Sequence, residues 1–319
     1  MNVKQLSASL GAECTNFDLA SKIQSMKDTQ IIQDLLLKHQ VLFFPKQHLT
    51  VEQHVQLGKY FAQSMDGHLQ GHPNLKLLGE AKQHKEIFEM QASAGGVADE
   101  WHTDLTFLQH PAKLSIMKMV KAAEIGGDTL FTNLSAAYDD LSLPMKDMCD
   151  GLTALHDADP HDKQDSMAIH PVVRIHPVTK RKALYVNEHF TRRIVELEAD
   201  ESKTLLEYLC SHVIKPKYTV RYSWQTDGQT IAFWDNSCTQ HCVLQNFNTE
   251  RIIQRVTIMG DRPEGSIKLP KYDSILEQHL KKMEIDNKNT WVQNNTASGR
   301  KDRQLFNFLR SQRSVSGKL

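Results

Sequence analysis

Residues 101–107 read W-H-T-D-L-T-F, a run of aromatic and β-branched residues that predicts a β-strand. In a strand, residues i and i+2 face the same way, so His102 and Asp104 would project together. An imidazole nitrogen and a carboxylate oxygen at one point are two ligands of a possible metal site. The chain has 16 histidines, so an H-x-D triplet alone is weak evidence. A third ligand is needed.

The third ligand is predicted in residues 231–243, I-A-F-W-D-N-S-C-T-Q-H-C-V, where His241 follows a strand-like run. Two histidines and one carboxylate form the ligand set of non-haem iron(II) oxygenases, which leaves three metal positions open. Zinc is the alternative in this segment, because Cys238 and Cys242 are also soft ligands. Strand parity turns His241 away from both cysteines, which disfavours zinc.

A second strand is predicted at residues 251–261, R-I-I-Q-R-V-T-I-M-G-D, after the turn that follows His241. Arg251 and Arg255 lie at positions i and i+4, on the same face and about 13 Å apart at ~3.3 Å per residue. One inward arginine is unusual, and two require anionic partners.

The rest of the chain predicts a mainly β protein with flanking helices. From residue 76 onward, short β-branched or aromatic runs are separated by Gly, Pro, Asn and Asp, which is the pattern of a sandwich or barrel. Helical periodicity is predicted in five stretches: residues 24–39, 51–62, 135–142, 144–152 and 199–213.

Composition limits the classes of partner and compartment. Lys plus Arg and Asp plus Glu are 38 each, so no net charge attracts nucleic acid or an anionic membrane. No apolar stretch approaches ~18 residues, and the first residues do not resemble a signal peptide. Five scattered cysteines are expected to be reduced thiols. We therefore expect a soluble, cytoplasmic protein that binds neither nucleic acid nor a membrane.

The composition changes after Pro263, so we predict two parts. Residues 1–263 would form the β-rich domain with its N-terminal and inserted helices. Residues 264–319 would form a polar, basic C-terminal extension. Two short amphipathic stretches in the extension are expected to be helical, docked on the surface or at a homo-oligomer contact.

At this point the sequence resembles the taurine dioxygenase group of iron(II)/2-oxoglutarate oxygenases, which also includes alkylsulfatases. The resemblance runs from about residue 5 to Pro263 and is densest in five blocks in the same order. These blocks are W-H-T-D-L-T-F, G-G-D-T-L-F-T-N, L-Y-V-N-E-H-F-T-R-R-I-V, W-D-N-S-C-T-Q-H and R-I-I-Q-R-V-T-I-M-G-D. It implies a double-stranded β-helix, or jelly-roll, core.

The resemblance also implies cofactors and residue roles. The cofactors would be Fe(II), 2-oxoglutarate as co-substrate, and O2, with the two histidines and the aspartate above on iron. Arg251 and Thr129 would hold the far carboxylate of 2-oxoglutarate, because a guanidinium and a hydroxyl both donate to carboxylate oxygens. The residues implied around an anionic primary substrate are His72, Phe107, Phe190 and Arg255.

Three departures argue against taurine itself as substrate. Ala98 stands where the taurine-specific enzyme has an asparagine, and Leu75 where it has an aromatic residue. The segment at residues 155–171 is shorter, which removes part of a substrate lid. We therefore expect a different small organic anion (sulfonate, sulfate ester or carboxylate), oxidised at an aliphatic C–H bond to give succinate and CO2.

Two alternatives remain at this stage. The same cofactors could carry out desaturation or oxidative ring closure of an amino-acid-like anion. A hydrolase, or a metal-binding jelly-roll protein without oxygenase activity, could use the same three ligands. Such a protein would have no need for the pair Arg251 and Thr129.

Overall fold

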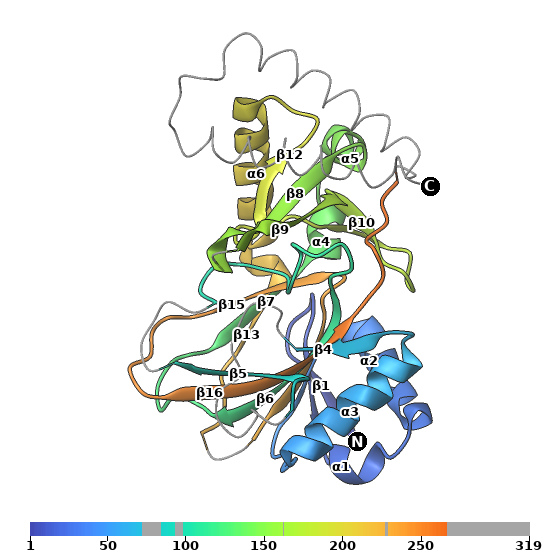
Figure 1. Cartoon of the computed structure of the whole chain (residues 1–319), viewed down its shortest axis with the longest axis vertical. Coiled ribbons are helices and arrows are strands. Elements are labelled where there is room, and N and C mark those ends of the chain that lie inside the picture. The colour runs from blue at the N-terminus through green and yellow to red at the C-terminus, as the bar shows by residue number, and fades with distance from the viewer. Residues whose placement is uncertain (72–83, 93–97, 162, 227–228, 267–319) are drawn as a thin grey trace.

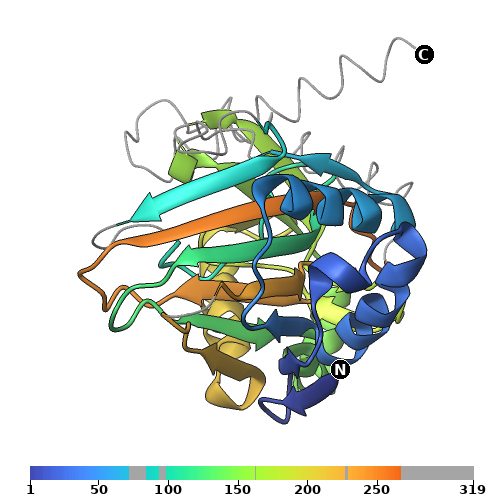
Figure 2. The ribbon, with the colours of Figure 1, turned by 90° about the horizontal axis from the view of Figure 1, so that it is seen from below.

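The computed structural model describes residues 1–71, 84–92, 98–161, 163–226 and 229–266. Its largest element is an eight-stranded sheet in the order β1-β2-β3-β14-β6-β16-β4, with β5 also paired to β16 (Figures 1 and 2). The strands are β1 (Asn2–Gln5), β2 (Ala12–Thr15), β3 (Val41–Phe44), β4 (His68–Gln70), β5 (Ile87–Ala92), β6 (Ala112–Lys121), β14 (Ile231–Asp235) and β16 (Arg251–Met259).

A three-stranded sheet in the order β13-β7-β15 faces the large sheet. Its strands are β7 (Thr129–Asn133), β13 (Thr219–Tyr222) and β15 (Thr239–Val243). An apolar core fills the space between the sheets and takes Val41 and Phe43 from β3, with Phe131 from β7 and Trp234 from β14. The alternation of β-strand side chains therefore lines one interior space with residues from both sheets.

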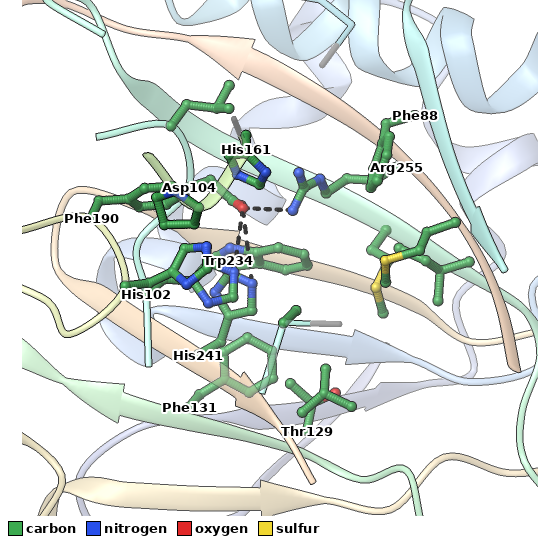
Figure 3. A pocket seen from close by; sticks show the side chains of 18 of the residues that line it. Phe88, His102, Asp104, Thr129, Phe131, His161, Phe190, Trp234, His241 and Arg255 are labelled. Carbon is green, nitrogen blue, oxygen red and sulfur yellow. Dashed lines mark hydrogen bonds and ion pairs between the residues drawn. The ribbon is translucent and has the colours of Figure 1, made fainter. Parts of the chain in front are cut away.

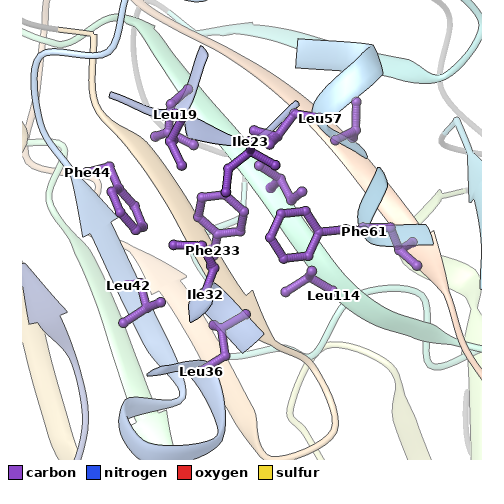
Figure 4. Close-up of a cluster of buried hydrophobic side chains, with 14 of the residues drawn as sticks. Leu19, Ile23, Ile32, Leu36, Leu42, Phe44, Leu57, Phe61, Leu114 and Phe233 are labelled. Carbon is purple, nitrogen blue, oxygen red and sulfur yellow. The ribbon is translucent and has the colours of Figure 1, made fainter. Parts of the chain in front are cut away.

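The opposite face of the large sheet is covered by N-terminal helices (Figure 4). They are α1 (Leu19–Lys22), a 3-10 turn (Met26–Thr29), α2 (Gln30–His39) and α3 (Val51–Ser64). Leu42 and Phe44, the alternate residues of β3, pack against Ile32 and Phe61 of these helices. Both faces of β3 are buried, which explains its continuous apolar sequence.

The remaining elements form the upper part of the molecule in Figure 1. A three-stranded sheet in the order β12-β8-β9 and a two-stranded sheet of β10 and β11 lie there with three α-helices and two 3-10 turns. Their bounds are α4 (Leu134–Asp139), α5 (Leu143–Asp150), β8 (Thr153–Ala158), η3 (Asp159–His161), β9 (Lys163–Pro171), β10 (Val173–Ile175), β11 (Lys182–Leu184), β12 (Thr191–Ile194), α6 (Ala199–Val213) and η4 (Pro216–Tyr218).

The fold class predicted from the sequence is confirmed: the chain is mainly β, with flanking and inserted helices around a jelly-roll core. Helix α6 occupies the predicted residues, and α3 begins after Thr50, whose side chain forms a capping box with Gln53. Within the described residues, no helix is long and apolar enough to cross a membrane. The C-terminal extension beyond residue 266, and predicted residues His72 and Leu75, lie outside the described residues.

The strand predicted at residues 101–107 is wrong. His102 makes only an isolated bridge with His241, and the chain then turns, with Leu105 at a φ of 58°. The reason is that side chains replace the strand ladder. Thr103 Oγ1 donates to the carbonyl of Thr239 at 2.8 Å, and the Asp104 amide donates to Asn236 Oδ1 at 3.3 Å. His102 and Asp104 still converge, through a turn and not through strand alternation.

Candidate metal centre

His102 and His241 come from distant parts of the chain and are joined by reciprocal backbone hydrogen bonds. The His102 amide donates to the His241 carbonyl at 3.0 Å, and the reverse bond is 2.9 Å. Their ring centroids are 4.1 Å apart. Nδ1 of His102 lies 2.8 Å from the Glu100 carbonyl, which only accepts, so Nδ1 carries the proton. The Nε2 lone pair of His102 is therefore free to bind a metal.

Asp104 completes the group. Its Oδ1 is 4.0 Å from Nε2 of His102 and 4.0 Å from Nε2 of His241, and all three side chains are buried. Asp104 is held from two strands of the large sheet. Ser115 Oγ on β6 donates to Oδ2 at 2.7 Å. Arg255 Nη1 on β16 donates to Oδ1 at 2.6 Å, as Figure 3 shows.

The electrostatics of these side chains suit a divalent cation. Burial would raise the pKa of Asp104, but the charge of Arg255, the two neighbouring histidines and the hydrogen bond from Ser115 together outweigh burial and keep that pKa below its ordinary value. Burial lowers the pKa of His102 to about 4, and it lowers the pKa of His241 well below its ordinary value. Two neutral imidazoles and a carboxylate thus face one another with lone pairs and no proton between them. This donor set fits non-haem iron.

The three side chains line a cavity of about 230 Å³ between the two sheets. Thr129 on β7 and Arg251 on β16 line it as well. Trp224 Nε1 donates to Thr129 Oγ1 at 3.0 Å, which leaves the hydroxyl proton of Thr129 available for a ligand. Gly127, at a φ of 68°, lets the chain pass close to Arg251: a Cβ there would lie 3.4 Å from Arg251 Cδ.

Arg251 is a buried guanidinium without an acidic partner among the described residues. It is 3% exposed, and its Nε has no hydrogen-bond partner there. Burial lowers the pKa of Arg251 to about 10, and no carboxylate offsets that cost. A buried charge without a counter-charge is expensive, so this end of the cavity is suited to an anion.

Some of the other residues predicted around the substrate line the cavity, and one does not. Arg255, Phe190 and Ala98 line the cavity, and the Arg255 guanidinium also lies 5.3 Å from the Phe88 ring centroid. Phe107 is not among the lining residues and packs against Phe190, with ring centroids 5.2 Å apart.

Three residues that border the cavity or support it were missed by the sequence. His161 and His189 line it near Phe190, and Trp224 supports Thr129. Two single histidines among 16 carry no sequence signal that separates them from surface histidines. The run Y-S-W-Q predicts a strand. The only signal in the sequence that Trp224 supports the cavity is that a tryptophan in a strand can point inward.

A second buried group, His176, Asp235 and Cys238, also brings three possible metal ligands together. The backbone amides of Val178 and Thr179 both donate to Nδ1 of His176, at 3.2 and 3.1 Å. The ring proton is therefore on Nε2, which donates to Asp235 Oδ2 at 2.8 Å. A metal on Nε2 would require an imidazolate, so this group is a structural pair.

The cysteines of the zinc alternative are both turned away from His241. Cys238 lies in the apolar cluster under α4 and α6, and Cys242 Sγ donates to the Asp99 carbonyl at 3.0 Å. All five cysteines are free thiols. The His–Asp–His group in a jelly roll, beside an unpaired buried arginine, instead defines the class of non-haem iron oxygenases.

Comparison with known proteins agrees with this class. The family described as "Taurine catabolism dioxygenase TauD, TfdA family" matches residues 2–257. The chain is 31% identical to an alpha-ketoglutarate-dependent sulfate ester dioxygenase of Pseudomonas putida, over 83% of this chain and 91% of that protein. It is 31% identical to an alkylsulfatase of Acinetobacter baylyi, over 83% and 87% respectively.

A solved structure agrees as well. The crystal structure of a taurine dioxygenase from Burkholderia xenovorans superposes with a TM-score of 0.72 at 36% identity, covering 83% of this chain and 91% of that chain. The chain belongs to the taurine dioxygenase family. It is an oxidoreductase that depends on Fe(II), on 2-oxoglutarate (alpha-ketoglutarate) and on O2.

Proposed function

We propose that His102, Asp104 and His241 hold the iron, and that the enzyme oxidises an aliphatic C–H bond of a small organic anion. The substrate would be a sulfonate, a sulfate ester or a carboxylate. One observation carries the proposal: two buried arginines of one strand face, Arg251 and Arg255, line the same cavity as the three ligands. The names of the related enzymes, which act on sulfate esters and sulfonates, support the anionic class.

The residues of the chain divide the work by position. We assign the far carboxylate of 2-oxoglutarate to Arg251 and Thr129, because Arg251 lacks a counter-charge and Thr129 retains a free hydroxyl proton. We assign the head group of the primary substrate to Arg255, whose Nη1 is engaged by Asp104 while Nε has no partner in the described part of the chain. Iron with 2-oxoglutarate and O2 supplies the oxidising power and yields succinate and CO2.

The direct test is O2-dependent succinate formation with Fe(II) and a panel of sulfonates, sulfate esters and carboxylates, with the organic product identified by mass spectrometry. At least one anion should raise succinate formation above the rate without substrate and appear as an oxidised product. If iron binds but no anion is oxidised, the proposal is wrong.

The two arginines should fail differently when replaced. Arg251→Ala should raise the KM for 2-oxoglutarate by roughly 30-fold or more, since losing a charge-assisted contact in a desolvated site costs ~2 to 5 kcal/mol. Arg255→Ala should mainly raise the KM of the primary substrate. It should also uncouple the reaction, so that succinate forms without an equal amount of oxidised product. Arg255→Ala should also weaken iron binding, because Arg255 donates a hydrogen bond to the ligand Asp104.

Arg255→Lys is the matched control, because it keeps the charge but loses the planar donor set. Titration of both co-substrates against the variants separates the two roles. Equal loss of both affinities in Arg251→Ala and Arg255→Ala would mean that the arginines only support the fold.

A further inference from the structure

Asp104 has no strand ladder to fix its orientation, because the chain turns there. The next residue, Leu105, has a φ of 58°. The carboxylate is nevertheless buried, and its Oδ1 lies 4.0 Å from Nε2 of both His102 and His241 (Figure 3). Contacts other than backbone pairing must therefore hold the carboxylate in this orientation.

A closed ring of hydrogen bonds holds both the side chain and the backbone of Asp104. Ser115 Oγ on β6 donates to Asp104 Oδ2 at 2.7 Å, and Asn236 Nδ2 donates to Ser115 Oγ at 2.9 Å. The ring closes where the Asp104 amide donates to Asn236 Oδ1 at 3.3 Å. All three residues are buried. The ring ties Asp104 to β6 and to the turn that follows β14.

The direction of each hydrogen bond in this ring follows from the groups that form it. The Asp104 amide and the Trp234 indole only donate, and both contact Asn236 Oδ1, the indole Nε1 at 3.2 Å. The NH2 group of Asn236 must then face Ser115 Oγ, which accepts from it. The hydroxyl proton of Ser115 is left for Asp104 Oδ2. Every donor in the ring is matched by an acceptor, so the ring has one direction.

The ring and Arg255 together fix the plane of the carboxylate. Ser115 engages Oδ2, and Arg255 Nη1 engages Oδ1 at 2.6 Å, so rotation about the Cβ–Cγ bond of Asp104 would break both contacts. An unrestrained carboxylate can bind a metal through one oxygen or through both. The second oxygen would occupy one of the three positions that two histidines and one carboxylate leave open. 2-Oxoglutarate, bound through its keto and carboxylate oxygens, and O2 need all three positions.

We propose that Ser115 and Asn236 are positioning residues, which restrict Asp104 to one metal-binding oxygen and so keep a metal position free for the co-substrates. Ser115 acts directly on the carboxylate. Asn236 acts through Ser115 and through the Asp104 amide. This inference rests on the proposed function, because it takes His102, Asp104 and His241 as the iron ligands. It goes beyond the ligand set, because it assigns a task to two side chains that are not ligands.

The first test compares two dicarboxylates on anaerobic enzyme loaded with Mn(II). Glutarate has the two carboxylates of 2-oxoglutarate but lacks the keto group, so it has one point of attachment fewer at the metal. Both compounds share the far carboxylate that we assign to Arg251. We call the ratio of their dissociation constants, measured by calorimetry, the keto preference.

Ser115→Ala should reduce the keto preference by roughly 10-fold or more, which is the range typical of an outer partner of a metal ligand. The reason is that the freed Oδ2 of Asp104 would compete with the keto acid end for a metal position. Mn(II) affinity should stay within about 10-fold of the wild type, because the second oxygen adds a contact to the metal. A residue that only supports the fold would not change the two quantities differently.

Three further variants serve as rescue, control and second member of the ring. Ser115→Thr keeps the hydroxyl donor and should restore the keto preference. Ser202→Ala is the matched control, because Ser202 is also buried and its Oγ accepts from the Ile194 amide at 2.8 Å, on α6. The control should lose stability and keep the preference. Asn236→Ala should lower the preference, and its effect should not add fully to that of Ser115→Ala, because the two residues share one chain of hydrogen bonds.

A crystal structure of the Mn(II)-loaded wild type tests the inference without any variant. Only Oδ1 of Asp104 should lie within bonding distance of the metal, and Oδ2 should keep its hydrogen bond to Ser115. In Ser115→Ala, both oxygens should lie within bonding distance. A wild-type metal held by both oxygens overturns the inference, even where the variants fail to fold.

Failure of this inference can be told apart from failure of the proposed function. None of these measurements needs an oxidised substrate, so they decide the role of Ser115 even if no anion in the panel is oxidised. If His241→Ala binds Mn(II) as well as the wild type does, the ligand set is wrong and the inference falls with it. If the ligand set holds, a folded Ser115→Ala that keeps the full keto preference, or that no longer binds Mn(II), overturns the positioning role.

Discussion

The chain buries two groups of histidine and acid with similar composition and opposite character. In the first, Asp104 faces two imidazole nitrogens at 4.0 Å, and no proton lies between them. In the second, Asp235 and His176 are joined at 2.8 Å by a proton that two backbone amides fix on Nε2. Residue types alone therefore do not decide which group can bind a metal. The positions of the protons on the histidine rings decide it.

The first prediction removes ligands from each group. Asp104→Ala or His241→Ala should reduce turnover to background and reduce iron from one per chain to nearly none. The loss should exceed the roughly 10- to 100-fold effect typical of altering an outer partner of a ligand. Asp235→Ala and His176→Ala should keep one iron per chain, as measured by elemental analysis.

Circular dichroism on the same samples separates lost metal from lost fold. If Asp235→Ala stays folded yet loses iron, or if the wild type holds two metals per chain, the proton argument is wrong. If His241→Ala keeps full activity, the proposed ligand set is wrong.

The second prediction concerns stability and pH. Burial would raise the pKa of Asp235, but the hydrogen bonds from His176 and the Ser237 amide, together with the charge of Arg174, outweigh burial, and the folded pKa lies below the ordinary 3.8. A lowered acid pKa stabilises the fold above the unfolded pKa, and that contribution is lost as the pH falls through the folded value. The pair should therefore stabilise the protein at pH 5–7 and lose that stabilisation progressively as the pH falls below about 3.8.

Asp235→Asn tests this, because its amide would place a donor against either His176 or the Ser237 amide. Breaking one side of a buried pair costs about 3–5 kcal/mol. Urea unfolding at pH 7 should show that loss, and the difference from wild type should shrink as the pH falls toward 3. A difference that is constant with pH would show that Asp235 is not ionised in the fold.

Much of the fold was predictable because it depends on local periodicity. Helix α6 and strand β16 occupy the predicted residues, since an amphipathic helix with acidic N-terminal residues and an alternating strand are each encoded within one segment. Arg251 and Arg255 share a face for the same reason. The resemblance of five ordered blocks added the jelly-roll topology, which periodicity alone does not specify.

The features that the sequence did not predict depend on contacts between distant segments of the chain. The turn at Asp104 replaces a strand because Thr239 and Asn236, far along the chain, satisfy its hydrogen bonds. His161 and His189 reach the cavity only because β8, β9 and β12 form a small sheet beside it. The proton position on His176 is set by amides that the sequence cannot place.

The last prediction has the smallest effect and concerns the two cysteines nearest the metal group in sequence. Cys238→Ser combined with Cys242→Ser should leave iron content and kcat within about two-fold, because neither sulfur faces the ligands. Stability should fall, since the hydroxyl that replaces the Cys238 thiol is more polar and lies in an apolar cluster, and such burial costs ~1 to 3 kcal/mol. Cys149→Ser is the matched control, because Cys149 lies in the same apolar cluster as Cys238. The control should lose similar stability and keep its iron. Iron lost from the double variant but kept in Cys149→Ser would restore the zinc-like reading of residues 238–242, and the contrast between the two buried groups would no longer hold.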